Sequence, residues 1–329
     1  MKRQFLPALL ALSLLPAFGT VAAQPGPAQA AAPQQRTQAP GFYRMMLGKV
    51  EITALLDGTH PFPVHEVMQG IGRAGADALL ERSDLHAPVE GSINAFLVNT
   101  GDRLVLIDSG AGVLYGKDGG HLMANLRASG YAPEQVDEIY LTHLHRDHVG
   151  GVDAGGAMAF PNAVIRVNRR DSDFWLDPKN RASVPGYLGP MFDGAIDSLR
   201  AYVAAGRLKP FDGEAWLLPE IDAIPGPGHT PGHTIYRIRS GGQTLLAWGD
   251  IVHVAAIQFP KPDATVKYDS DAASAERQRE QMFAEAAKTG EWIAAAHISF
   301  PGIGHIRRDD GGYSWLPANY TTDLAPATR

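Results

Sequence analysis

The chain has 329 residues, of which 45% are hydrophobic and 19% charged, so its composition excludes a largely disordered protein and its length suits one large or two small domains. The formal net charge is −6 and no stretch carries a basic excess, so a nucleic-acid partner is not expected. Cysteine is absent, which excludes disulfides and thiolate zinc sites, and any metal must be held by His, Asp or Glu.

The N-terminus has the pattern of an export signal. Lys2 and Arg3 form a short positive region, an apolar run covers residues 5–18, and Val21-Ala22-Ala23 is a small-residue cleavage site. A buried N-terminal helix, the alternative, is disfavoured because a Pro-, Ala- and Gln-rich stretch follows at once. We expect a bacterial periplasmic or secreted protein without a membrane anchor after cleavage. The expected parts are a signal peptide (1–23), a flexible arm (24–40) and a single domain (41–329).

Strand and helix signals alternate along the rest of the chain. Apolar, β-branched runs bounded by turn residues predict strands at 50–56 (ending at Asp57-Gly58), 93–98, 104–107, 139–141, 163–167, 235–238, 244–248 and, as the final core strand, 293–296. Helical spacing that stops at a glycine predicts helices at 121–128, 192–205 and 272–287. Residues 93–107 and 235–248 are expected to form hairpins. The pattern favours an α/β fold of two packed sheets with helices outside.

The strongest chemical signal directly follows the strand at 139–141. Residues 142–151 read THLHRDHVGG, which places His143, His145, Asp147 and His148 within six residues. On an extended segment His143 and His145 point the same way, while the other two lie where the chain turns and can serve a second metal. Zinc suits these donors, and manganese, iron and cobalt also remain open. We expect the glycine pair to tighten the backbone into a following helix.

Two metals need more ligands than this cluster supplies. A second histidine pair lies in Gly228-His229-Thr230-Pro231-Gly232-His233. Asp250 follows the strand at 244–248, and His297 follows the strand at 293–296. Ligands at the ends of separate strands can converge on one edge of a sheet sandwich, so we expect a single site with two metals.

The set HxHxDH, GHTPGH, GD and AH resembles the metallo-β-lactamase superfamily, whose fold is an αββα sandwich of two mixed sheets with helices outside. Within it the chain is similar to the methyl parathion hydrolase group and its lactonase relatives, the dihydrocoumarin hydrolase type among them. The similarity covers about residues 39–320. The stretches that carry it most specifically are GYAPEQVDEIYLTHLHRDHVGGV (130–152) and HISFPGIGHIR (297–307).

The resemblance implies a ligand set for two divalent ions, most suitably zinc. The first ion would be held by His143, His145 and His229, and the second by Asp147, His148 and His297. Asp250 would bridge the ions together with a hydroxide. His233 is not a ligand in the family and would support the ligands from behind. Asp108 matches an aspartate that orients ligand histidines, although a strand-end turn carboxylate is the alternative. Related enzymes are homodimers, so a homodimer is implied.

This constellation predicts hydrolysis by an activated hydroxide, with Asp250, Asp147 and His253 as the catalytic residues. Because one group of β-lactamases uses a cysteine where this chain has Asp250, antibiotic hydrolysis is disfavoured. The export signal argues against a glyoxalase II-like or nuclease activity, and so does the absence of a basic patch that would bind such substrates. Lactones or aryl esters, and organophosphate triesters, remain as substrates.

Several residues match pocket positions of the methyl parathion hydrolases. Tyr115, Trp175, Met191 and Phe192 fall on the aromatic leaving-group pocket, and packing of a surface helix is the alternative for Trp175. Three further positions differ from the organophosphate specialists: His253 replaces a leucine, Val67 an arginine and Tyr268 a leucine. A histidine at position 253 can donate a hydrogen bond to a substrate carbonyl or leaving alkoxide.

These differences favour a lactonase or aryl esterase with a promiscuous phosphotriesterase activity, acting on a small ester or lactone. A triester hydrolase of the methyl parathion hydrolase type is the first alternative. A metal-binding module without catalytic activity is the second, and metal analysis of the mature protein would discriminate it.

Overall fold

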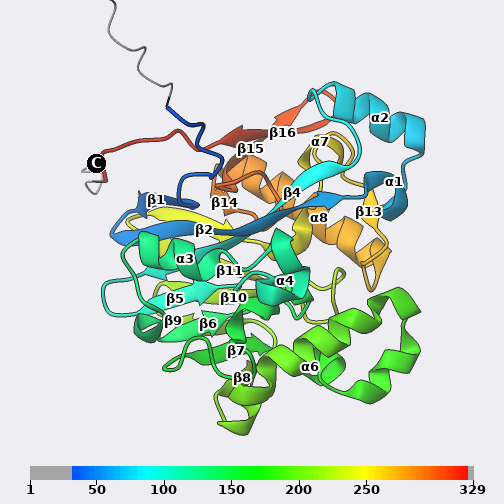
Figure 1. The fold of residues 1–329 in the computed structure, drawn as a ribbon. Coiled ribbons are helices and arrows are strands. Elements are labelled where there is room, and N and C mark those ends of the chain that lie inside the picture. Colours follow the sequence, from blue (N-terminus) through cyan, green and yellow to red (C-terminus); the bar gives the residue numbers. More distant parts are fainter. Residues whose placement is uncertain (1–31, 325–329) are drawn as a thin grey trace, which may run out of the picture. The chain divides into compact units, whose positions relative to one another are not determined.

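Two seven-stranded sheets form the centre of the protein (Figure 1). The computed structural model describes residues 32–324, and the chain from Ala39 onward forms one compact unit. The first sheet has the order β1-β2-β4-β5-β6-β7-β8 and the second β16-β15-β14-β12-β11-β10-β9. Both sheets mix parallel and antiparallel pairs. The predicted signal peptide and the first part of the predicted arm lie outside the described residues.

The strands and helices have the following bounds. The first sheet contains β1 (Phe42–Leu47), β2 (Val50–Phe62), β4 (Val89–Asn99), β5 (Leu104–Ile107), β6 (Glu138–Tyr140), β7 (Val164–Asn168) and β8 (Leu208–Phe211). The second contains β9 (Ala215–Leu218), β10 (Ile221–Pro225), β11 (Thr234–Ser240), β12 (Gln243–Ala247), β14 (Trp292–Ala294), β15 (Ile303–Asp309) and β16 (Gly312–Pro317). A small sheet pairs β3 (Met68–Gln69) with β13 (Thr265–Val266). The helices are α1 (Val64–Val67), α2 (Arg73–Glu81), α3 (Leu122–Ala128), α4 (Arg146–Val149), α5 (Arg169–Trp175), α6 (Gly189–Ala204), α7 (Ala255–Gln258) and α8 (Ala272–Thr289).

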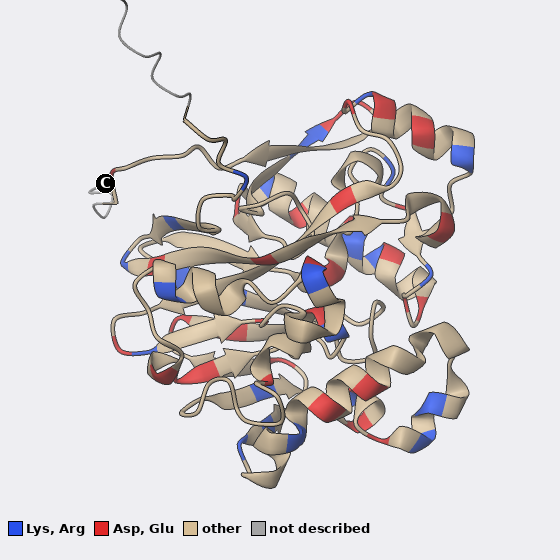
Figure 2. Cartoon of the chain, in the orientation of Figure 1, with Lys and Arg blue, Asp and Glu red and all other residues tan. Residues whose placement is uncertain are grey.

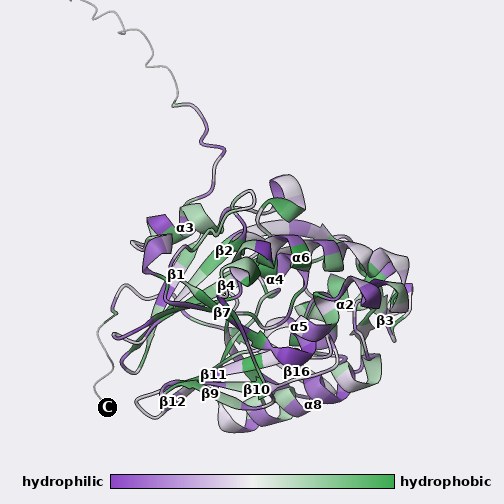
Figure 3. Ribbon diagram, turned by 90° about the horizontal axis from the view of Figure 1, so that it is seen from below, coloured by the Kyte–Doolittle hydropathy of each residue, from purple (hydrophilic) through white to green (hydrophobic). Residues whose placement is uncertain are grey.

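Strand alternation divides the core into layers. In β4, Phe96 and Val98 face the second sheet, while Ala95 and Leu97 face outward toward helices. Helices α3, α5 and α6 cover the outer face of the first sheet, and α8 covers the outer face of the second. Hydrophobic residues accordingly concentrate on the strands and on the inner helix faces (Figure 3). Acidic and basic residues both occur along helices such as α8 (Figure 2). The predicted α/β sandwich with outer helices is therefore confirmed.

Several sequence-based elements are confirmed and three need correction. The hairpins β4–β5 and β11–β12 form, and α8 ends where Gly290 adopts a φ of +70°. The strand at 293–296 is not the last, because β15 and β16 follow it. Gly150 and Gly151 do not precede an α-helix: they follow α4 and lie in a single 3-10 turn, Gly150–Val152. A Cβ on Gly150 or Gly151 would lie 2.0 Å or 1.9 Å from a backbone carbonyl oxygen. They are required for close backbone approach.

Asp57-Gly58 is a β-bulge rather than the end of a strand. The pairing of β2 with β4 shifts register between Leu56 and Gly58 and then continues to Phe62. The bulge turns the Asp57 carboxylate inward, where it accepts the backbone N–H groups of four residues. These are Ala111 at 2.9 Å, Gly112 at 3.2 Å, Gly120 at 3.0 Å and Leu122 at 3.1 Å. A buried carboxylate therefore fixes the loop that precedes α3.

No helix among residues 32–324 is long and apolar enough to cross a membrane.

Replacing Asp57 by Ala leaves four N–H groups without their acceptor. Each unsatisfied buried group costs about 1–3 kcal/mol, so we expect Asp57→Ala to lower the free energy of unfolding by at least about 3 kcal/mol. Urea denaturation followed by circular dichroism measures this change. Asp102→Ala, in an exposed turn, is the control and changes stability by less than about 0.5 kcal/mol. A loss below about 1 kcal/mol for Asp57→Ala would contradict this role.

Candidate metal centre

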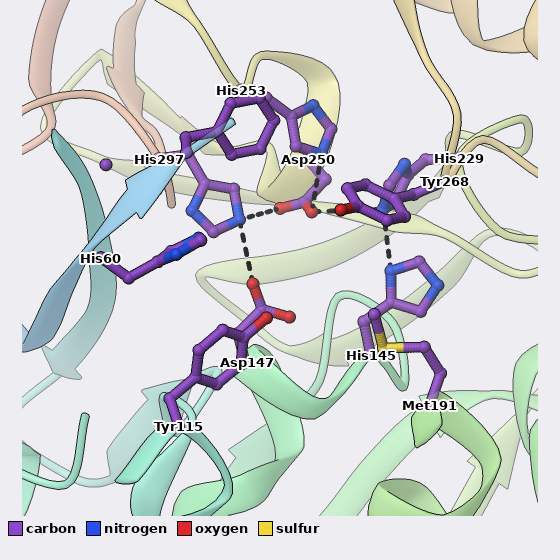
Figure 4. Close-up of a pocket in the computed structure, with 12 residues that line it drawn as sticks. His60, Tyr115, His145, Asp147, Met191, His229, Asp250, His253, Tyr268 and His297 are labelled. Atoms are coloured by element: carbon purple, nitrogen blue, oxygen red, sulfur yellow. Dashed lines mark hydrogen bonds and ion pairs between the residues drawn. The ribbon is translucent and has the colours of Figure 1, made fainter. Parts of the chain in front are cut away.

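Eight side chains with metal-binding donors come together at one edge of the sandwich, and Figure 4 labels His145, Asp147, His229, Asp250, His253 and His297 among them. They lie on the segment from β6 into α4, in the loop before β11, in the turn after β12 and in the loop after β14. One group whose donor atoms lie within 4.8 Å of one another is His143, His145, His229 and Asp250. A second group is Asp147, His148 and His297, and a third is Asp250, His253 and His297. All are buried or half-buried, so the loops at the ends of four strands converge on one enclosed site.

The carboxylate of Asp250 lies between the first two groups and is 3% exposed. Its Oδ2 faces His143 Nε2 at 3.6 Å and His229 Nε2 at 3.2 Å. Its Oδ1 faces His148 Nε2 at 3.0 Å and His297 Nε2 at 3.2 Å. Each oxygen thus serves one histidine group, which is the geometry that a bridging carboxylate needs.

Three of these imidazoles are oriented by an acceptor on their outer nitrogen. His148 Nδ1 lies 2.9 Å from Asp108 Oδ2, and His229 Nδ1 lies 2.7 Å from Asp269 Oδ1. His297 Nδ1 donates to the backbone carbonyl of Ser92 at 2.9 Å. When Nδ1 carries the hydrogen, Nε2 presents its lone pair to the interior. All three lone pairs then face the Asp250 carboxylate.

The histidine lone pairs and the carboxylate oxygens of Asp250 repel one another unless positive charge lies between them. Divalent cations would supply that charge, so the ligand atoms present fit a metal site. Nε2 of His143, Nε2 of His148 and Oδ1 of Asp250 are buried without a hydrogen-bond partner. His145 Nδ1 lies 3.0 Å from His229 Nε2, a close approach of two imidazole nitrogens. A nitrogen- and oxygen-rich set without sulfur suits zinc, and also manganese, cobalt or iron.

Burial and charge separate the histidines into two classes. Burial lowers the pKa of His143 and His145 well below the usual value, which keeps these rings neutral as metal ligands must be. Burial also opposes charge on His229, but its bonds to Asp250 and Asp269 raise its pKa to about 9. The two carboxylates therefore favour positive charge at this position, whether a proton or a cation supplies it.

His233 and Asp108 hold the ligand-bearing backbone. His233 Nδ1 donates to the carbonyl of Gly226 at 3.1 Å, and its Nε2 accepts the Asp250 N–H at 3.0 Å. Asp108 accepts from the N–H and the hydroxyl of Thr142, both at 2.8 Å. Gly249 has a φ of +56°, and a Cβ there would lie 2.6 Å from His233 Nε2. The ring nitrogens of His233 and the carboxylate oxygens of Asp108 are thus occupied by these hydrogen bonds and by the bond of Asp108 to His148, so neither residue belongs to the candidate ligand set.

Sequence reasoning missed two buried carboxylates of the site. Asp269 holds His229, and its Oδ2 accepts the Val266 N–H at 3.0 Å. Asp171 accepts the N–H of Leu144 at 3.0 Å and of Gly232 at 2.6 Å, which ties the two histidine-bearing loops together. Burial raises the pKa of Asp171 to about 6. Neither residue belongs to a motif, and only three-dimensional proximity identifies them.

A pocket opens over these clusters of histidine and aspartate side chains (Figure 4). Of the predicted pocket residues, Tyr115, Met191, His253 and Tyr268 line it. His253 is buried, with Nε2 3.2 Å from Asp250 Oδ2 and Nδ1 without a partner. His60, for which the sequence predicted no metal-binding role, also lines the pocket: His60 and Phe62 do so from β2 and Gly91 from β4.

Three predicted pocket residues lie elsewhere, and this corrects the sequence-based assignment. Trp175 and Phe192 are 1% and 0% exposed and belong to the core between α5, α6 and the first sheet. The Trp175 ring contacts His145 edge-on at 5.0 Å, so it supports a ligand from behind. Val67 is fully buried among α1, α2 and α7. Side chains of these sizes are drawn into apolar clusters when their element packs against the core.

Comparison with known proteins places this geometry in a family. The model described as "Metallo-beta-lactamase superfamily" matches residues 88–297. A crystal structure described as hydrolase AbOPH in the beta lactamase superfamily is 40% identical, with a TM-score of 0.82 over 87% of this chain and all of that chain. The dizinc quorum-quenching lactonase AidC, solved with a product, is 28% identical, with a TM-score of 0.79 over 86% of this chain and 99% of its own.

A curated relative is more distant. Probable metallo-hydrolase Rv2300c of Mycobacterium tuberculosis is 29% identical over 199 residues, which are 49% of this chain. This chain spans 59% of the length of that relative.

The bond between Asp269 and His229 predicts an effect on metal affinity. In Asp269→Ala the His229 ring loses the acceptor that fixes its orientation and tautomer, so we expect metal affinity to fall about 10–100-fold. Competition with a chromophoric chelator measures the affinity. Asp263→Ala removes a half-exposed carboxylate just before β13 and serves as the control, with an unchanged affinity. An affinity for Asp269→Ala within about twofold of wild type would show that the bond does not support the metal.

Proposed function

The chain belongs to the metallo-beta-lactamase superfamily, and we propose that it is a hydrolase that opens lactones or cleaves aryl esters with two divalent cations. The observation that carries the proposal is the Asp250 carboxylate, which directs one oxygen to each of two histidine groups beneath a pocket. The lactonase AidC, which is described as dizinc, supports both the number of cations and the substrate class.

Cations held here would supply an activated water and polarise an ester carbonyl. The residues of the chain hold and shape the site. Asp250 and Asp147 contribute the carboxylates, and the bonds of Asp108 and Asp269 keep two imidazoles in the required orientation. Because the centre is enclosed by buried side chains, electrostatic interactions there are stronger than in water.

His253 is the side chain that distinguishes substrates in this proposal. Its ring stacks on His297 with an interplanar angle of 20° and lies beside Phe62. Burial lowers the pKa of His253, so at pH 7 it is neutral and acts through an N–H group rather than as a charged acid. A neutral donor in this position fits a planar lactone carbonyl. Tyr115 and Met191 line the opposite wall of the pocket (Figure 4).

The proposal extends to features that sequence alone supports. We place the chain with the methyl parathion hydrolase and dihydrocoumarin hydrolase group on the stretches at 130–152 and 297–307. Promiscuous phosphotriesterase activity and a homodimer are proposed from the same resemblance, and export to the periplasm or medium from the pattern at residues 1–23. A metal-binding module without activity is disfavoured, because the full donor set opens into a pocket.

Paired turnover assays on metal-replete protein test the function. We expect kcat/KM to favour dihydrocoumarin over methyl parathion. His253→Leu is expected to lower lactone turnover by about tenfold or more, the value of one hydrogen bond of about 1.5 kcal/mol, and to leave triester turnover within about threefold.

Phe62→Leu is the matched control, because it alters the pocket wall beside His253 without removing a hydrogen-bonding group. It is expected to affect both substrates alike. A wild-type preference for the triester would exchange the main and the side activity. Equal losses on both substrates in His253→Leu would remove the proposed role of His253, and no turnover of either by metal-loaded protein would reject the function.

A further inference from the structure

Arg279 is a buried cation that the functional proposal does not use. It lies in the middle of α8 and is 1% exposed. Its hydrogen-bond partners are three backbone carbonyl groups: Nε donates to Ile251 at 2.7 Å, and Nη1 donates to Pro262 at 2.7 Å and to Ala264 at 2.8 Å. Burying a charge is costly even with carboxylates such as Asp269 nearby, and an apolar side chain of similar volume often serves stability as well or better. The presence of a buried arginine at this position therefore needs a reason other than stability, and its three carbonyl partners suggest one.

The carbonyl groups belong to two segments that build the site. Ile251 lies in the Asp250 segment (residues 249–254), which contains Asp250 and His253. Pro262 and Ala264 lie in the Tyr268 segment (residues 262–269), which contains the pocket residue Tyr268 and the His229 partner Asp269. The planar guanidinium donates to both segments at once, which a lysine ammonium on a flexible stem reproduces poorly.

Gln258 makes the same connection from the opposite side. It is fully buried at the end of α7. Its Oε1 accepts the N–H of His253 at 2.7 Å, and its Nε2 donates to the Ala264 carbonyl at 3.0 Å. The Ala264 carbonyl thus receives two hydrogen bonds, one from Arg279 and one from Gln258, and both residues also bind the Asp250 segment.

We propose that Arg279 is a positioning residue for the hydrolytic site: with Gln258 it fixes the distance between the Asp250 segment and the Tyr268 segment. This distance determines where Asp250 and His253 lie relative to His229, whose partner Asp269 is on the Tyr268 segment, and how wide the pocket is at Tyr268. The inference rests on the proposed function for its kinetic consequence only. Its structural consequence, restraint of the two segments, holds for any reaction at this site.

The test compares Arg279→Lys, Arg279→Met and Gln258→Met with Arg277→Met, an exposed arginine on the same helix. Three quantities are measured on full-length protein well below the unfolding midpoint. They are amide hydrogen exchange of His253 and Val266, affinity for zinc by chelator competition, and kcat and KM for dihydrocoumarin. We expect exchange at both amides to accelerate about tenfold or more in Arg279→Lys and Arg279→Met.

Zinc affinity and kcat/KM are expected to fall about tenfold or more in the same variants. Gln258→Met removes the acceptor of the His253 N–H, so exchange at that amide accelerates at least as much, while zinc affinity and kcat/KM fall by a smaller factor. Arg277→Met leaves all three quantities unchanged. If Arg279→Met does not fold, Arg279→Lys and Gln258→Met decide the question. A double-mutant cycle of these two shows non-additive losses, because both side chains bind the Ala264 carbonyl.

The proposal is overturned if the folded variants show only a lower unfolding midpoint, with exchange, zinc affinity and kinetic constants as in wild type. Exchange and zinc affinity require no substrate, so they separate this inference from the proposed function. Faster exchange with weaker zinc binding supports the positioning role even if the wild type turns over no lactone. Normal lactone turnover in the wild type with unchanged exchange in the variants rejects the positioning role alone.

Discussion

The structure depends on one buried carboxylate that five imidazoles surround. Asp250 lies within 3.6 Å of nitrogen atoms of His143, His148, His229, His253 and His297. A carboxylate with 3% exposure is unfavourable unless positive charge compensates it. The Nδ1 bonds of three of these rings turn their Nε2 lone pairs toward it. Two cations held here would resolve both constraints, and the rest of the fold holds the side chains that would bind them in place.

Other buried carboxylates keep the ligand-bearing loops and side chains in position. Asp108 orients His148 and binds the Thr142 N–H, Asp171 ties the two histidine-bearing loops, and Asp269 orients His229. Each accepts hydrogen bonds from backbone N–H groups or an imidazole, so its burial is compensated. The strands bring the loops to one edge, and these acidic side chains determine where the loops lie.

Much of the fold and of the donor set could be predicted because both leave local patterns. Apolar runs identified the two hairpins, and Gly290 identified the end of α8. The HxHxDH run identified half of the donor set, since its residues are close in sequence. Asp171 and Asp269 could not be found in this way, because their partners lie 27 and 40 residues away along the chain. Local turn chemistry also misled at Asp57-Gly58, where tertiary hydrogen bonds make a bulge of what resembled a strand end. Trp175 and Phe192 show the same limit. The family resemblance placed these residues near the pocket, but packing of α5 and α6 against the first sheet turns their side chains into the core.

Anomalous diffraction from crystals of the metal-replete protein determines whether Asp250 bridges two cations. We expect two metal peaks, one on either side of the Asp250 carboxylate. One would contact Oδ2 with His143, His145 and His229, and the other would contact Oδ1 with Asp147, His148 and His297. A single peak, or a peak held by His253 and His297 with Asp250 on one side only, would contradict the bridging role on which the proposed function is built.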